Sequence, residues 1–183
     1  SSLSRSLPFI PFFFFTLYFF MLFPFFLLYF IRAHNPPTNP EEHLKNYISV
    51  MEKGLVDVIS HPGNASYPCD YEELLVAAKK YNVAVEINSS SDVNTRKGSH
   101  ENCVKIAHLA KKIGTTISLG TDSHISYYLG NFESVMEILK DANIGEDQII
   151  NTSPLKVLDF LESRGKEPIS PAKAAPATGA YLP

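Results

Sequence analysis

A carboxylate and an imidazole stand two residues apart at Asp122 and His124. They come shortly after the mostly apolar run 117–119, which is followed by a glycine at position 120. In an extended chain, residues i and i+2 point to the same face, so these two side chains leave the strand end side by side. Carboxylate oxygens and imidazole nitrogens are both common ligands of divalent metals. The spacing therefore indicates a pair of metal ligands. A turn aspartate beside an exposed histidine stays open as the alternative.

Other polar side chains occupy the same kind of position. His61 directly follows an apolar run, and Glu86 lies late in the next one. In parallel α/β folds the ligand site lies at the carboxyl ends of the strands, so these groups converge on one edge if the strands are neighbours. We therefore expect His61, Asp122 and His124 to be metal ligands. A histidine in a capped loop is the alternative for His61.

A short basic loop, residues 94–98, belongs to the same predicted edge and immediately precedes a predicted helix. Arg96 and Lys97 would lie beside the free N–H groups of that helix, an arrangement that suits an anion. A solvated basic turn is the alternative. The remaining histidines show no comparable placement, and we interpret three of them as helix residues without a catalytic role: His43, His100 and His108.

The elements that must position these residues alternate between helix and strand. Helices are predicted after the caps Asn39, Asp70, Ser99 and Ser153, and near Phe132. Strands are predicted at residues 55–60, 83–88, 116–119 and 148–151. These runs are continuously apolar rather than alternating, which is typical of a parallel sheet covered by helices. Such a set of strands is too small to close a barrel by itself.

Residues 8–31 form an uncharged stretch that is rich in phenylalanine. Roughly 20 apolar residues cross a bilayer as a helix, so the length fits a transmembrane or signal-anchor segment. Pro8, Pro11 and Pro24 would bend such a helix or delay its start. Three interpretations stay open: a membrane anchor, an error of gene assembly that replaced another N-terminus, and a buried segment of a soluble domain.

Charge and cysteine content exclude other classes of protein. The net charge is −3, with acidic and basic residues mixed along the chain, so no nucleic-acid partner is predicted. Cys69 and Cys103 do not form a Cys-x-x-Cys pair, which excludes a zinc knuckle and predicts two reduced thiols in or near a core. We expect three parts: an apolar segment with its linker at 1–37, a folded domain at 38–165, and a disordered tail rich in proline and alanine at 166–183.

Several segments of the chain also resemble the motifs of a known family. They are, in chain order, DVISHPGN at 57–64, EINSS at 86–90, RKGSHENC at 96–103, LGTDSH at 119–124, NTSP at 151–154 and FLESRG at 160–165. Together they resemble the polymerase and histidinol phosphatase (PHP) family, in its small bacterial phosphatase type. The resemblance covers roughly residues 38–168.

The resemblance implies a fold class: the C-terminal portion of a distorted (β/α)7 barrel similar to a TIM barrel, here preceded by the apolar segment. PHP proteins hold up to three metal ions, usually zinc or manganese, and hydrolyse phosphate esters. His61 resembles a ligand from the middle of their site, Asp122 and His124 resemble its last ligand pair, and Arg96 resembles a basic residue near the substrate phosphate. The implied substrate is a phosphorylated small molecule, and the implied location is cytoplasmic.

The sequence departs from the family pattern at its beginning. PHP proteins carry a His-x-His motif on the first strand and a bridging glutamate soon afterwards, whereas here the stretch 8–31 stands where those strands are expected. We therefore expect fewer metals than three, and weak or no turnover. The alternative is a non-catalytic remnant that binds a metal or a partner and is tethered to a membrane by residues 8–31. The sequence predicts no oligomeric state.

Overall fold

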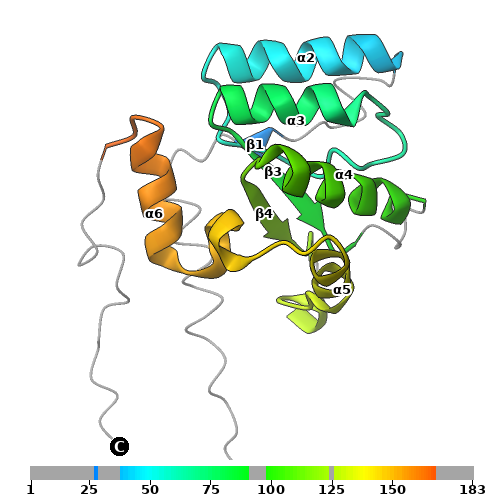
Figure 1. The fold of residues 1–183 in the computed structure, drawn as a ribbon, viewed down its shortest axis with the longest axis vertical. Coiled ribbons are helices and arrows are strands. Elements are labelled where there is room, and N and C mark those ends of the chain that lie inside the picture. Colours follow the sequence, from blue (N-terminus) through cyan, green and yellow to red (C-terminus); the bar gives the residue numbers. More distant parts are fainter. Residues whose placement is uncertain (1–26, 29–37, 91–97, 124–125, 168–183) are drawn as a thin grey trace, which may run out of the picture. The chain divides into compact units, whose positions relative to one another are not determined.

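Parallel strands form one sheet within the residues that the structure, a computed structural model, describes: 27–28, 38–90, 98–123 and 126–167. The strands are β1 (Leu27–Leu28), β2 (Val58–Ile59), β3 (Ala84–Asn88) and β4 (Ile117–Gly120), and they follow that order across the sheet (Figure 1). Each neighbouring pair is parallel, with Ile59 beside Val85 and Val85 beside Ile117. This is the pairing that continuously apolar strands predict.

The helices begin where the sequence predicts, and in three of the five described helices a local side-chain cap fixes the first turn. Asn39 Oδ1 accepts a hydrogen bond from the Glu42 amide at 2.9 Å, and Asp70 Oδ1 accepts one from the Glu73 amide at 3.0 Å. The helices are α2 (Pro40–Glu52), α3 (Tyr71–Lys80), α4 (His100–Ile113), α5 (Glu133–Asp141) and α6 (Pro154–Ser163), and the short 3-10 turns are η2 (Ser126–Tyr128), η3 (Glu146–Gln148) and η4 (Ile150–Thr152).

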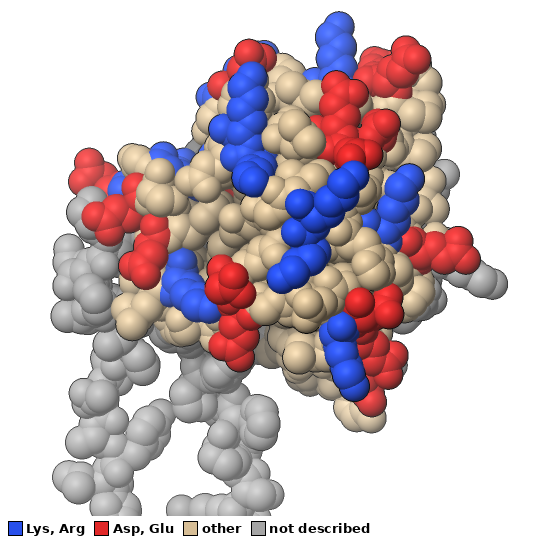
Figure 2. Space-filling model, viewed as in Figure 1, with Lys and Arg blue, Asp and Glu red and all other residues tan. Residues whose placement is uncertain are grey.

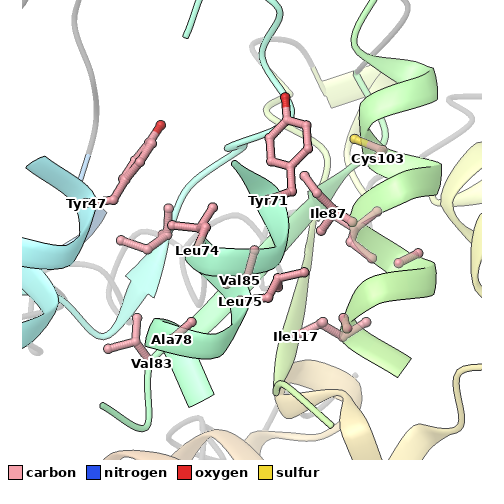
Figure 3. Packing of buried hydrophobic residues seen from close by; sticks show 14 of the residues in the cluster. Tyr47, Tyr71, Leu74, Leu75, Ala78, Val83, Val85, Ile87, Cys103 and Ile117 are labelled. Atoms are coloured by element: carbon pink, nitrogen blue, oxygen red, sulfur yellow. The ribbon is translucent and has the colours of Figure 1, made fainter. Parts of the chain in front are cut away.

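Helices α3 and α4 pack on one face of the sheet, and α2 packs against α3 (Figure 1). Val85, Ile87 and Ile117 from the strands lie with Leu74 and Leu75 from α3 in one buried hydrophobic cluster (Figure 3). All five side chains are fully buried. Burial of each contributes roughly 1.5–3 kcal/mol. This apolar layer therefore fixes how β3 and β4 lie beneath the helices.

On β3 and β4, the opposite face of the sheet carries small and polar residues. Successive strand residues point to alternate faces, so Ala84, Glu86 and Asn88 point away from the apolar layer. The register places Ser118 beside Glu86 and Gly120 beside Asn88. Glu86 and Asn88 thus stand near the carboxyl end of β3 beside a serine and a glycine, whose small size leaves room for their side chains.

A buried ion pair ties the end of α6 to the amino ends of the strands. Arg164, which directly follows α6, donates from Nε to Asp57 Oδ1 at 2.7 Å, and Asp57 directly precedes β2. The guanidinium also donates to the carbonyl oxygens of Val56, Tyr81 and Asn82, which precede β2 and β3. The Asp57 side chain is fully buried, and the Arg164 side chain is 6% exposed. One side chain thus joins the starts of two strands.

The predicted fold class, the C-terminal portion of a distorted (β/α)7 barrel, is wrong. The described strands form an open sheet with β1 and β4 at its edges. A barrel instead requires each strand to be paired on both sides.

The strand predicted at 148–151 is also wrong, since this segment forms η3 and η4 and makes a single bridge, Ile117 to Ile149. The Asn151 side chain explains the difference: its Oδ1 accepts from the Leu119 amide at 2.9 Å and its Nδ2 donates to the Leu119 carbonyl at 2.8 Å. A side-chain amide therefore takes the place of a neighbouring strand's backbone.

The predicted membrane segment is not supported either. In the parts of the chain that the structure describes, no helix is both long enough and apolar enough to cross a bilayer. The described piece of the stretch 8–31 is Leu27–Leu28, which is strand β1 and pairs with β2. Apolar composition does not by itself distinguish a membrane-spanning helix from a strand of a parallel sheet, because both are continuously apolar. The rest of 8–31 lies outside the described residues.

Residues 26–166 group as one compact unit. The predicted division into 1–37, 38–165 and a tail at 166–183 stays a prediction, because most of both terminal parts lies outside the described residues.

Candidate active site at the carboxyl ends of the strands

His61 lies just beyond the carboxyl end of β2 and is nearly buried, at 9% exposed. Its carbonyl accepts a hydrogen bond from the Asn64 amide at 3.1 Å, which closes a tight turn. The Asn102 side chain in α4 donates to the Gly63 carbonyl at 2.9 Å and anchors that turn to the helix. The Ser99 hydroxyl, predicted as a helix cap, instead accepts from the Ala65 amide at 3.3 Å. The first turn of α4 therefore holds the loop that carries His61.

Glu86 is the central polar side chain of this edge. Its Oε2 accepts a hydrogen bond from the backbone amide of His61 at 2.7 Å and another from the Ser60 hydroxyl at 3.2 Å. Because Glu86 belongs to β3 and the two donors follow β2, the carboxylate joins the ends of two neighbouring strands.

The end of β4 lies against the same carboxylate. A methyl group added at Gly120 would lie 2.6 Å from Glu86 Cδ and 2.9 Å from Asn88 Nδ2, and closer still to Glu86 Oε1. The Ser89 amide donates to the Gly120 carbonyl at 2.8 Å, so the chain segments leaving β3 and β4 stay together beyond the sheet. Asp122 comes two residues after Gly120. The edge thus brings the His61 loop, Glu86 and the Asp122 loop into one region.

Both described metal-ligand candidates have a left-handed backbone. The φ angle is +33° at His61 and +47° at Asp122. Residues other than glycine rarely adopt this conformation, which costs roughly 1–2 kcal/mol per residue. Such conformations cluster at functional sites, where the surrounding structure holds them in place. Two of the four non-glycine residues with positive φ in the described part of the chain therefore lie at this edge, and the other two are Asn82 and Asn143.

The structure tests the predicted site residues only in part. His61 follows β2 and Asp122 follows β4, the two strands that flank β3 in the sheet. His124 and Arg96 lie outside the described residues, so their roles stay predictions. Within the described part of the chain, no group of three or more histidine, cysteine, aspartate or glutamate side chains is arranged to hold a metal ion. His61 and Asp122 supply suitable donor atoms, but they do not make a complete metal site on their own.

Thiols and phenols cluster in the core near this edge and are not activated. Burial raises the pKa of the Cys69 thiol to about 12, with the neighbouring Asp70 carboxylate adding to the effect. Burial likewise raises the pKa values of Tyr47 and Tyr71. Since the thiolate is the nucleophilic form of cysteine, Cys69 is unsuited to nucleophilic catalysis. Cys69 and Cys103 are both thiols that form no disulfide, as predicted.

The other described histidines lie in helices. His43 shows most clearly why its role is structural: it is 1% exposed, its Nε2 accepts from the Thr38 amide at 2.9 Å, and its Nδ1 donates to the Pro68 carbonyl at 2.8 Å. Both ring nitrogens are therefore occupied by the backbone.

The linking role of Glu86 and the need for glycine at position 120 were not predicted from the sequence. A signal for both existed. A carboxylate inside an otherwise apolar strand requires a local partner, and a glycine ending the adjacent strand often marks a close approach of other atoms. The partners themselves, the Ser60 hydroxyl and the His61 amide, follow from strand order and register, which the sequence does not give.

Taken together, the geometry defines a parallel α/β domain with a polar, conformationally constrained site at the carboxyl edge of its strands. The chain is similar to a probable phosphatase of Pectobacterium carotovorum, with 47% identity over 135 residues that make up 74% of this chain and 55% of the relative. It is also similar to probable phosphatases of Proteus mirabilis (46% over 129 residues, 70% of this chain, 53% of the relative) and Shewanella oneidensis (41% over 140 residues, 75% and 56%). This chain spans about half the length of these curated relatives. No family model matches it.

Proposed function

We propose that this chain carries the phosphate-ester site of a metal-dependent phosphatase of the PHP family, and that it hydrolyses phosphate monoesters slowly. The observation that carries the proposal is the meeting of His61, Glu86 and the Asp122 loop at one edge of the sheet, in a chain 41–47% identical to probable phosphatases. The motifs around these residues support the choice of family.

The roles in the proposal follow from side-chain chemistry. His61, Asp122 and His124 supply nitrogen and oxygen donors to zinc or manganese, with further ligands needed beyond the described residues. Such an ion would polarise the phosphoryl group and lower the pKa of a bound water. Arg96 neutralises charge on the phosphate, and it shares this task with the N-terminal amides of α4, which begins at the same edge.

The proposed substrate is a phosphorylated small molecule. Figure 2 shows basic and acidic side chains interspersed on the face drawn, whereas a nucleic-acid surface gathers lysine and arginine into one patch. The predictions that no nucleic acid binds and that the protein is cytoplasmic remain part of this proposal.

The test is hydrolysis of p-nitrophenyl phosphate by the full chain, first treated with EDTA and then supplied with zinc or manganese. We expect slow release of nitrophenol that depends on the added metal and is at least tenfold slower in Asp122→Asn. Asp159→Asn, at an exposed position of α6, is the matched control and should keep the full rate. Equal rates for the two variants, or a rate indifferent to metal, would contradict the proposal.

A further inference from the structure

We infer that Glu86 is a positioning residue: its carboxylate fixes the backbone of His61 so that the imidazole is held at the carboxyl edge of the sheet. The consequence for catalysis rests on the proposed function, whereas the positioning itself does not. Nothing in the chemistry proposed above requires Glu86 to touch substrate.

Two hydrogen bonds converge on one carboxylate oxygen of Glu86. Glu86 Oε2 accepts from the His61 amide at 2.7 Å and from the Ser60 hydroxyl at 3.2 Å. A bond from an amide to a carboxylate is shorter and roughly twice as strong as one between neutral groups. The carboxylate therefore holds two consecutive residues at the point where the chain leaves β2.

These bonds maintain an uncommon backbone conformation at His61. His61 has φ of +33°, a left-handed backbone that is uncommon for residues other than glycine. The turn beyond it is anchored separately by Asn102, which donates to the Gly63 carbonyl at 2.9 Å. Glu86 thus fixes the entry of the His61 turn and Asn102 fixes its exit.

Gly120 leaves the space that the Glu86 carboxylate occupies. Glu86 lies over the α-carbon of Gly120, where any larger residue would overlap it. The same glycine leads to Asp122 two residues later. The Glu86 side chain is therefore held between the end of β4 and the end of β2, and a displacement at Gly120 is transmitted to His61 through it.

The test compares Glu86→Ala and Glu86→Gln with Glu137→Ala, which changes an exposed glutamate of α5. Amide hydrogen exchange by NMR is the main measurement. In Glu86→Ala we expect the His61 amide to exchange at least tenfold faster, while the Val85 amide, bonded to the Thr116 carbonyl at 3.0 Å, is unchanged. Glu86→Gln keeps an acceptor oxygen and should restore most of the protection. Glu137→Ala should leave both amides unchanged.

Gly120→Ala gives a second, independent route to the same result. The added methyl group should displace the carboxylate and raise His61 exchange about as much as Glu86→Ala does. In the double variant Glu86→Ala/Gly120→Ala the carboxylate is already gone, so the glycine change should add less than twofold. Exchange at His61 that is unchanged in Glu86→Ala, or fully additive in the double variant, would overturn the inference.

Kinetics separate positioning from a purely structural role. We expect Glu86→Ala to lower kcat for p-nitrophenyl phosphate at least tenfold with KM changed less than twofold, and Glu86→Gln to recover most of the rate. Loss of kcat equal in Glu86→Gln and Glu86→Ala would overturn the role in positioning for catalysis. A wild-type chain without turnover would instead contradict the proposed function, and the exchange measurement would still decide whether Glu86 positions His61.

Discussion

Replacement of Arg164 by alanine should destabilise the fold more than any other single loss of charge that the structure describes. The change removes the hydrogen bond to Asp57 and the three bonds to backbone carbonyls before β2 and β3. It leaves the Asp57 carboxylate fully buried, with the Lys166 ammonium 3.5 Å from Oδ1 as its remaining charged neighbour. Loss of one partner from a buried pair costs about 3–5 kcal/mol because the other charge stays buried, and Lys166, whose side chain is 31% exposed, offsets only part of that cost.

This loss is a large fraction of the free energy of unfolding of the whole domain. Domains of this size have free energies of unfolding of about 5–15 kcal/mol. For an m value of about 1.5 kcal/mol/M, the urea midpoint of Arg164→Ala should fall by about 2–3 M. Circular dichroism of the full chain in a urea series measures this directly.

An exposed ion pair of similar length provides the matched control. Lys112 Nζ lies 2.9 Å from Glu72 Oε1, but the two side chains are 69% and 56% exposed. Exposed pairs contribute about 0–1 kcal/mol, so Lys112→Ala should shift the midpoint by less than about 0.7 M. Equal shifts for Arg164→Ala and Lys112→Ala would refute the argument that burial makes the Arg164 pair important.

Two further predictions concern the core. Leu74→Ala should cost about 2–5 kcal/mol because the side chain is fully buried, whereas Val76→Ala, at a position 52% exposed, should cost less than about 1 kcal/mol, both measured by urea unfolding. Cys69 should react with iodoacetamide about a thousandfold more slowly than an unfolded cysteine at pH 8, measured in Cys103→Ser, since burial raises its pKa to about 12. The folded state holds this proton more tightly than the unfolded chain, so the associated stability is fully present below about pH 8.5 and is lost as the pH rises towards 12. Rapid labelling of folded Cys69 at pH 8 would contradict the burial argument.

The helices follow from local sequence because the signals that define them are local. Asn39 and Asp70 each cap a first turn through a bond to the residue three positions later, so a short window of sequence contains the whole cause. Ser99 before α4 is also a residue that commonly caps helices, yet its hydroxyl accepts a hydrogen bond from the Ala65 amide in a distant loop. A tertiary contact there replaced the local one.

The sheet follows from sequence less well because its edges depend on partners far along the chain. The apolar strands are recognisable, but β2 is shorter than the apolar run 55–60 that predicts it. Strand β1 comes from the stretch 8–31, for which a membrane anchor was one of three open interpretations. At the other edge of the sheet, the Asn151 side-chain amide forms hydrogen bonds with both the backbone amide and the backbone carbonyl of Leu119. No pattern of apolar residues predicts such a contact.

The positions of two candidate site residues were predictable because polar residues directly beyond apolar runs mark the carboxyl ends of strands. His61 and Asp122 are polar residues just beyond apolar runs, and the structure places both at the carboxyl edge. Glu86 could be recognised as unusual but not assigned, since its role depends on the His61 amide and on Gly120, contributed by two other parts of the chain.

The central claim is that phosphate esters are hydrolysed at this edge through His61, and release of inorganic phosphate by His61→Ala tests it most directly. This change removes the imidazole while the backbone amide that binds Glu86 remains. His108→Ala, which removes an exposed imidazole from α4, is the control. With zinc or manganese present and folding verified by circular dichroism, we predict at least tenfold slower release in His61→Ala and an unchanged rate in His108→Ala. Equal rates in His61→Ala and the wild-type chain would contradict the account.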